Sequence, residues 1–343
     1  MSSHLCALLA AVLTLPSAPG PALRDGAPVM IPPGALTPAA PLPPRGPLPL
    51  LAHLADGSGA KLPLPVGLAV TGLLQGEDIL VKHLQVGVHR DGELAQPVDA
   101  AFVQFGAVHT RVQNVIARAD AWLFPFFNLY GFLGETWSQT KSVIVRPLLL
   151  DIETDSKGVT AGFGGTLAGG VGTLFFVALD LNFAWTSLDV LTQPQRTMTF
   201  TPRAGHTFTP HWTGDRDLTL WFGTTYQEFQ GDVVGSASLA GNVPDNVTAL
   251  LPPDYGVWLN GLPSGQRAAV STLLGQLVTA TGKPEDAAHA RADFALQLKT
   301  RRSNPLLVGG ELQLDPQWQI RVEAGFLGAR ATVMAGLTCR MGL

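Results

Sequence analysis

The C-terminal segment of the chain alternates strictly between apolar side chains and small or polar ones, and this alternation constrains the fold more than any other feature. The apolar set comprises Ala331, Val333, Ala335, Leu337, Cys339, Met341 and Leu343. The residues between them are Thr, Met, Gly or Arg. Side chains that alternate with a period of two point to opposite faces of a β-strand. The segment therefore predicts a strand with one apolar face and one small or polar face.

The same alternation recurs along most of the chain, which predicts a large antiparallel sheet. It is clear at 306–314 and 318–326, which are joined to each other and to the last strand by hairpin-sized turns. It is also clear at 175–186 and 218–227. Less regular candidates lie at 66–74, 80–89, 112–123, 127–137, 143–150, 159–167, 196–208 and 292–300. Single-chain bacterial barrels favour even strand numbers, so we predict about twelve strands.

The composition indicates which solvent the apolar face meets. The chain is 46% hydrophobic and only 14% charged, with 38 Gly. A soluble sheet would carry frequent Lys, Glu and Asp on its second face, whereas here that face is mostly Gly, Thr, Asn, Gln and Ala. Aromatic residues suited to a membrane interface lie near the predicted strand ends, namely Trp122, Trp137, Trp185, Tyr226 and Trp318. We predict an all-β fold, a closed antiparallel transmembrane β-barrel; the alternative is a soluble lipocalin-like barrel or sandwich.

The N-terminal part of the chain differs from the rest. Residues 1–22 contain an apolar core followed by small residues, which predicts a signal peptide, although a short buried helix is the alternative. Residues 23–65 are rich in proline and predict an extended periplasmic linker. The barrel should then occupy 66–343. Because Cys6 falls in the signal peptide, Cys339 has no disulfide partner in the mature chain. Export and the barrel pattern together predict the cell outer membrane as the location.

One insertion interrupts the strands. Between 241 and 290 there are proline-marked turns, then Ser264 ahead of a stripe of apolar residues at helical spacing, which predicts a capped helix. Long loops of such barrels are extracellular, but the segment could also fold into the lumen as a plug. A helical hairpin without any activity is the third possibility.

Several motifs resemble those of uncharacterised outer-membrane β-barrel proteins of Gram-negative bacteria, a porin-like or transporter-like group. They are NVIARADAWLFPFFNLYG at 114–131, LDLNFAW at 179–185, LDVL at 188–191 and TPRAG at 201–205. The ending GLTCRMGL at 336–343 is similar to the C-terminal strand that the outer-membrane assembly machinery reads, except that Met341 and Leu343 stand where an aromatic residue is usual. The resemblance implies a fold and an assembly partner, and it supplies no catalytic residue.

The sequence contains no pattern typical of an enzyme, a metal site or a nucleic-acid surface. No His lies at a telling spacing from a serine, and the glycines at 162–165 are not followed by a phosphate-binding helix. Asp151, Glu153 and Asp155 could bind calcium, but a solvated acidic turn is the simpler interpretation. Basic residues are scattered and the net charge is −4, which excludes nucleic acid. We predict no cofactor and no catalytic residue.

A set of charges falls on the inward positions of the predicted strands. These lumen-lining candidates are Arg118, Asp120, Asp180, Arg203, Glu311, Arg321, Glu323 and Arg340. Neighbouring opposite charges, such as Glu311 beside Arg321 or Glu323 beside Arg340, could hold the barrel shut or line a polar pore. The leading hypothesis is a barrel that passes or binds small solutes, with the insertion modulating access. The rivals are a structural or surface-interaction barrel with a plugged lumen, and a lipid-active enzyme. The expected partners are outer-membrane lipid, the assembly machinery and a small solute.

Overall fold

The structure, a computed structural model, describes residues 47–52, 63–94, 96–171, 175–208, 216–239, 250–281, 289–300 and 304–342. The predicted signal peptide at 1–22 and most of the predicted linker at 23–65 lie outside the described residues.

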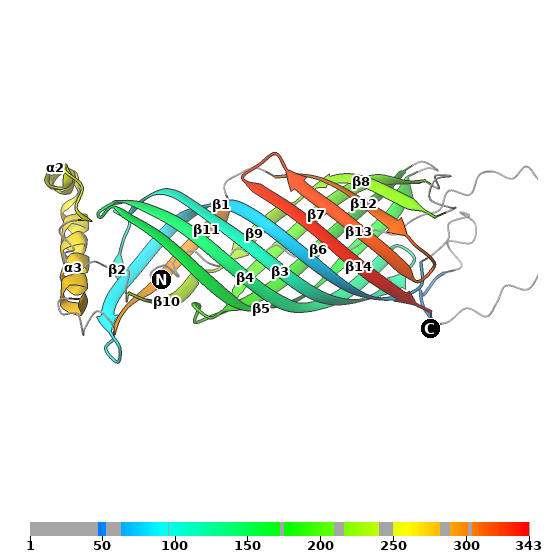
Figure 1. The fold of residues 1–343 in the computed structure, drawn as a ribbon, viewed down its shortest axis with the longest axis horizontal. Helices are drawn as coiled ribbons and strands as arrows, with labels where there is room; N and C mark the ends of the chain where they lie inside the picture. Colours follow the sequence, from blue (N-terminus) through cyan, green and yellow to red (C-terminus); the bar gives the residue numbers. More distant parts are fainter. Residues whose placement is uncertain are drawn as a thin grey trace, which may run out of the picture.

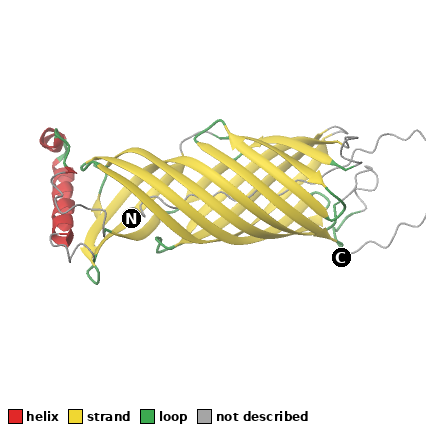
Figure 2. Cartoon of the chain, viewed as in Figure 1, coloured by secondary structure: helices red, strands yellow, loops and turns green. Residues whose placement is uncertain are grey.

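Ten antiparallel strands form a closed barrel (Figures 1 and 2). Their order around the ring is β1 (Val66–Arg90), β14 (Arg330–Met341), β13 (Trp318–Phe326), β12 (Leu306–Gln313), β8 (Leu218–Thr224), β7 (Gln195–Phe208), β6 (Phe175–Leu188), β5 (Leu150–Val171), β4 (Phe127–Arg146) and β3 (Gln104–Phe124). Strand β3 pairs again with β1 and closes the ring. The predicted number of twelve is therefore wrong.

Four further strands extend the wall at one end: β2 (Val98–Asp99), β9 (Tyr226–Gln230), β10 (Val233–Ser238) and β11 (Ala290–Thr300). Strand β1 joins the two parts, because it pairs with β14 up to Glu77 and with β11 from Ile79 onward. The helices α2 (Tyr255–Gly261) and α3 (Ser264–Thr281) lie at this same end (Figure 1). We call it the helix end; the opposite end, where β1 begins and β14 finishes, is the terminal end.

The strand count differs because polar stretches between the predicted strands belong to longer strands. Residues 75–78 continue β1, with Gln75 and Glu77 buried and Asp78 exposed, and residues 138–142 continue β4. The predicted acidic turn at 151–155 is likewise part of β5. A strand whose inner face is polar can run through such stretches without ending. Conversely, the predicted strand at 218–227 is interrupted at Thr225, which separates β8 from β9.

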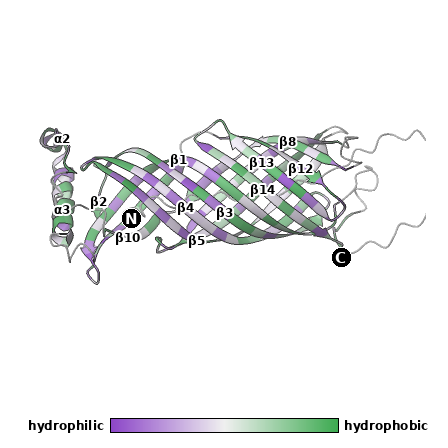
Figure 3. Cartoon of the chain, viewed as in Figure 1, coloured by the Kyte–Doolittle hydropathy of each residue, from purple (hydrophilic) through white to green (hydrophobic). Residues whose placement is uncertain are grey.

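The barrel wall is polar inside and apolar outside, the reverse of a water-soluble protein. Leu133 is 57% exposed and Phe222 60%, whereas Thr136, Thr160 and Asp180 are fully buried. Figure 3 shows apolar and polar residues alternating along the strands. Four of the five predicted interface aromatics lie on the outer face, but Trp122 is 1% exposed and points inward, so its predicted interface position is wrong.

The apolar outer residues form a belt near the terminal end. Outward positions are apolar or glycine from Val66 to Leu74 on β1 and from Val159 to Leu167 on β5. Toward the helix end they become charged, as at Asp78 and Lys157. A tilted transmembrane strand needs about 9–11 residues, which matches the height of this belt. Neither described helix is long and apolar enough to cross a membrane.

Candidate functional site

All eight charged residues predicted to line the lumen point inward in the structure. They come from six strands, and each is at most 7% exposed. Buried charges are stable only when paired and hydrogen-bonded, so their partners decide whether the lumen is open or closed. They gather in three clusters, centred on Glu323, Asp120 and Asp180.

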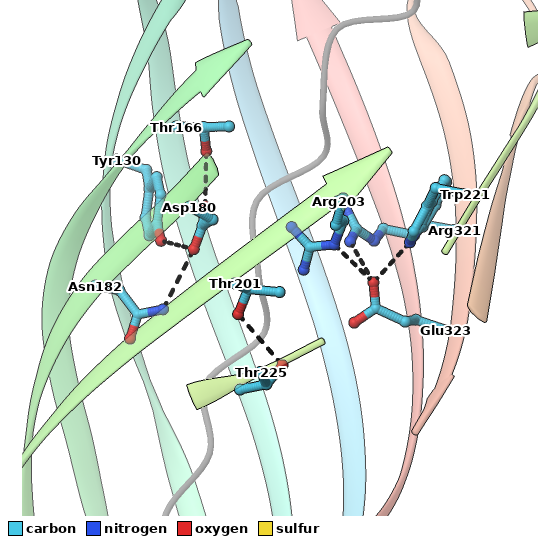
Figure 4. Close-up of polar contacts among 10 residues, drawn as sticks. All are labelled: Tyr130, Thr166, Asp180, Asn182, Thr201, Arg203, Trp221, Thr225, Arg321 and Glu323. Atoms are coloured by element: carbon cyan, nitrogen blue, oxygen red, sulfur yellow. Dashed lines mark hydrogen bonds and ion pairs between the residues drawn. The ribbon is translucent and has the colours of Figure 1, made fainter. Parts of the chain in front are cut away.

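The first cluster surrounds the Glu323 carboxylate of β13. Its Oε2 atom accepts hydrogen bonds from Arg203 Nε at 3.1 Å, Arg321 Nη2 at 2.9 Å and Trp221 Nε1 at 2.9 Å (Figure 4). The Arg321 guanidinium also stacks over the Trp221 ring, 4.6 Å from its centre. Glu311 lies directly opposite Arg321 in the β12–β13 register. Strands β7, β8 and β13 are thereby joined through the interior.

The second cluster surrounds Asp120 of β3. Its Oδ1 atom accepts from Asn128 Nδ2 at 2.7 Å and from Arg340 Nη2 at 3.3 Å. Arg118 donates to the Asn128 oxygen at 3.1 Å and stacks 3.8 Å from the centre of the Tyr130 ring. Arg340 therefore reaches Asp120 across β1, and the pairing predicted between Arg340 and Glu323 is wrong.

The third cluster surrounds Asp180 of β6. Its carboxylate accepts from the Tyr130 hydroxyl at 2.9 Å, Thr166 Oγ1 at 2.7 Å and Asn182 Nδ2 at 3.4 Å (Figure 4). Because Tyr130 also contacts Arg118, this ring links the Asp180 cluster to the Asp120 cluster. The three clusters together are called the lumen network below.

A separate buried ion pair lies farther toward the helix end. Arg330 Nη2 donates to Glu77 Oε1 at 2.9 Å and Arg330 Nε donates to Glu77 Oε2 at 3.2 Å, and Gln75 Nε2 adds a third bond at 3.1 Å. The pair lies at the last register position between β1 and β14. Sequence reasoning missed it because Glu77 lies between the predicted strands 66–74 and 80–89, and so has no inward position assigned to it.

Aromatic rings fill the interior between the clusters, and glycines on neighbouring strands make room for them. A Cβ atom on Gly162 would stand 2.2 Å from Cζ of Phe132, and one on Gly164 would stand 2.4 Å from the Tyr130 hydroxyl. A Cβ on Gly309 would be 2.5 Å from the Trp221 ring. These glycines lie within strands and accommodate inward aromatic rings. Together with the lumen network, the rings occupy the lumen at the height of the apolar belt.

Threonine hydroxyls line the interior closer to the helix end. Thr160 Oγ1 lies 2.7 Å from Thr136 Oγ1 and 2.9 Å from Thr186 Oγ1, so one chain of hydroxyls crosses β4, β5 and β6. Thr110 and Thr140 form a similar pair at 3.0 Å between β3 and β4. These contacts satisfy buried hydroxyl groups and tie adjacent strands together.

At the helix end the interior becomes apolar. Side chains of β1, β4, β5, β10 and β11 pack there with α3 in the largest hydrophobic cluster of the described residues. A cavity of about 120 Å³ remains between α3 and the strands; its lining includes Val86, Ile152, Leu273, Leu277, Ala292 and Phe294. The apolar residues around this cavity are called the outer chamber below.

A wider cleft of about 800 Å³ opens beside the outer chamber, between β9, β11 and the β-bulge of β1. Its lining includes Lys82, Glu228 and Lys299 on the outer face of the wall. It also includes Gln227 and Arg330, which point inward. The cleft is therefore lined from both faces of the wall, and the buried ion pair of Arg330 and Glu77 lies at its inner side.

The remaining sequence candidates form no further site in the described part of the chain. His206 lies on the outer face between the rings of Phe175 and Phe208, with ring centres 5.9 and 4.9 Å away. Glu153 forms an exposed ion pair with Lys141 at 3.1 Å. Within the described ranges, no group of three or more His, Cys, Asp or Glu side chains is arranged to hold a metal ion.

No protein-family model matches the sequence, and no curated protein matches it significantly. Solved structures with a similar strand arrangement include the β-domain of the Bordetella autotransporter BrkA. The two are 8% identical with a TM-score of 0.37, over 81% of this chain and 100% of that one. The transport unit of the Escherichia coli autotransporter AIDA-I is 10% identical, with a TM-score of 0.34 over 81% and 90% of the two chains. An outer-membrane channel of Pseudomonas putida F1 is 9% identical, with a TM-score of 0.31 over 81% and 96%.

Proposed function

We propose that this chain is a β-barrel of a bacterial outer membrane that binds or passes small solutes. The observation that carries the proposal is the apolar belt around a closed barrel with a polar interior. An exposed surface of this kind is unfavourable in water but favourable in lipid, and only helices and closed barrels can satisfy every backbone group there. Outer-membrane lipid is then the partner of the belt. The assembly machinery is the partner of β14, and no catalytic activity is assigned.

The lumen network supports a barrel that is closed at the height of the belt. Glu323 and Arg203 meet through the interior, as do Asp120 and Arg340. The rings of Tyr130 and Trp221 fill the space beside them. A solute held in the wall cleft therefore lies on the helix-end side of the lumen network. Passage across the membrane requires these ion pairs to separate, so binding is the resting activity and transport is conditional.

A second function is favoured by the surface of the helices. Val257 of α2 is 79% exposed and Val278 of α3 is 55% exposed, both at the helix end. Apolar residues exposed there suit a barrel that serves as a plugged anchor and binds a partner through its helices. In that case the lumen network is purely structural.

Planar-bilayer recordings on the refolded full chain test the solute-passing function. We expect few or no single-channel steps from the wild type. We expect steps from the variant Arg203→Ser/Arg321→Ser/Glu323→Ser, which removes the cluster that links β7 to β13. Folding into lipid is checked first by the change in gel mobility on heating. If the folded serine variant and a variant lacking residues 241–290 both show no single-channel steps, the solute-passing function is contradicted. The barrel would then serve as a plugged anchor.

A further inference from the structure

We infer that the outer chamber is a binding site for a small apolar molecule, and that α3 is its cover. The inference deepens the proposed function by naming the class of solute, and it rests on that function. The first observation is chemical: the side chains that line the cavity, from Leu84 on β1 to Leu277 on α3, carry no charge. A water molecule in such a cavity finds few partners, so the cavity favours an apolar occupant over water.

The second observation is the position of the chamber. Strands β4 and β5 also line the chamber, and their inward residues are polar at the height of the belt, as at Asn128 and Thr166. At the helix end, beyond the belt, the inward side chains form one large apolar cluster, and the outer face there is charged. The apolar interior is therefore not needed for the transmembrane span. It forms a separate apolar compartment at the end that carries the long helical insertion, and long loops of bacterial barrels lie on the extracellular side.

The size of the cavity sets the size of the ligand. An engineered protein cavity of about 150 Å³ lined by Leu, Ile and Phe stays dry and binds benzene. The chamber cavity of about 120 Å³ is close to this volume. An unfilled cavity of this kind forfeits dispersion contacts that a ligand would restore. The fitting ligand is therefore a compact, uncharged molecule about as large as a single aromatic ring.

The contacts of α3 show how the chamber is covered. Leu273, Leu274 and Leu277 point into the cavity, and Val270 is fully buried beside them. Polar contacts from α3 to the rim are few. Gln276 accepts from the Val88 amide at 3.1 Å and donates to the Gln96 carbonyl at 3.0 Å, and Arg90 donates to the Thr279 carbonyl at 2.7 Å. The cover thus depends mainly on apolar packing, which a bound apolar molecule can extend.

Methyl NMR on the full chain in bilayer nanodiscs made of deuterated lipid tests the site, with benzene as the probe. We expect the methyl signals of Ile152, Leu277 and Ala292 to shift and saturate. The lipid-facing methyls of Val333 and Leu337 should shift in proportion to benzene without saturating, because benzene also dissolves in the bilayer. Chamber methyls that only follow the lipid-facing ones overturn the inference.

Two variants and a control make the test specific. Ala292→Leu fills the cavity and should weaken benzene binding at least tenfold, whereas Ala335→Leu on the lipid face of β14 should leave it unchanged. Leu277→Ala enlarges the cavity and should bind naphthalene at least tenfold more tightly than the wild type. Wild-type affinity in folded Ala292→Leu, or no gain for naphthalene in Leu277→Ala, overturns the site. Absence of a folded barrel in lipid refutes the proposed function instead, and the two failures are distinguished by gel mobility.

Discussion

Removal of the Glu323 carboxylate should be the most damaging single change to the lumen network. Glu323→Ala leaves the guanidinium groups of Arg203 and Arg321 buried together, with side-chain exposures of 1% and 6% and without the oxygen that both of them contact. It also removes the acceptor of the Trp221 indole N–H. Breaking a buried ion pair by removing one partner costs about 3–5 kcal/mol, and here one acceptor serves two charges. We therefore expect a loss in the free energy of unfolding of about 3–5 kcal/mol.

The loss is measurable by urea unfolding of the barrel in lipid vesicles, followed by tryptophan fluorescence. With a slope of about 2 kcal/mol per molar urea, the unfolding midpoint should fall by about 1.5–2.5 M. Replacing all four charged residues of the cluster by apolar ones, as in Arg203→Met/Glu311→Leu/Arg321→Met/Glu323→Leu, should restore most of the loss, because no unpaired charge then remains in the cluster. Glu153→Ala removes an exposed ion pair with Lys141 and should cost less than about 1 kcal/mol.

Two results would refute this reasoning. One is a midpoint shift below about 0.5 M for Glu323→Ala, which at the same slope means a loss of about 1 kcal/mol. It would show that water reaches the arginines and that the lumen is open at this height. The other is a quadruple variant as unstable as the single one, which would show that the cluster contributes shape and packing instead of charge compensation.

Two further substitutions test the interior packing and the belt. Gly164→Ala places a Cβ against the Tyr130 hydroxyl and the Leu181 carbonyl, at 2.4 and 2.6 Å, and should lower the same urea-derived stability by about 1–3 kcal/mol. Gly169→Ala meets nothing within 4 Å, so an equal loss in both variants would contradict the packing argument. Leu337→Arg puts a charge near the middle of the belt and should cost about 2–4 kcal/mol in vesicles. Asp155→Arg on the outer face of β5 lies beyond the belt and should be nearly neutral; similar losses for both would place the membrane elsewhere.

The sequence predicted the faces of the strands better than their ends. Alternation at Phe175–Leu188 and Arg330–Met341 assigned the outward and inward residues as the structure has them, because one face meets an apolar surrounding in both strands. The ends were less accurate, since Gln75, Gly76, Glu77 and Asp78 look like a turn unless the barrel interior is known to be polar. The count of closing strands therefore could not be derived from local pattern alone.

The contacts between the charged residues also could not be predicted from the sequence. The inward positions of Asp120 and Arg340 follow from the alternation of side chains along each strand. Their contact, however, depends on β14 and β3 both pairing with β1. The same closure brings together Glu77 and Arg330, which are separated by most of the chain. The roles of Tyr130 and Trp221 depend on glycines on neighbouring strands, and only the register shows which glycine faces which ring. The helix beginning at Ser264 was predictable, but its contact with the outer chamber was not.

The ion pair between Glu77 and Arg330 has a consequence for the assembly of the ring. The first and last barrel strands must pair in one register. A shift of β14 along β1 by two residues would nevertheless keep every apolar side chain on the lipid side. Such a shift would place Glu77 opposite Thr332, and it would leave the charges of Glu77 and Arg330 buried without each other as partners. The hydrophobic pattern alone cannot distinguish the two registers, whereas the ion pair can. The pair thus favours the correct register at the point where β1 stops pairing with β14 and begins pairing with β11. The strands that extend toward the helix end therefore continue from a ring closed in the correct register.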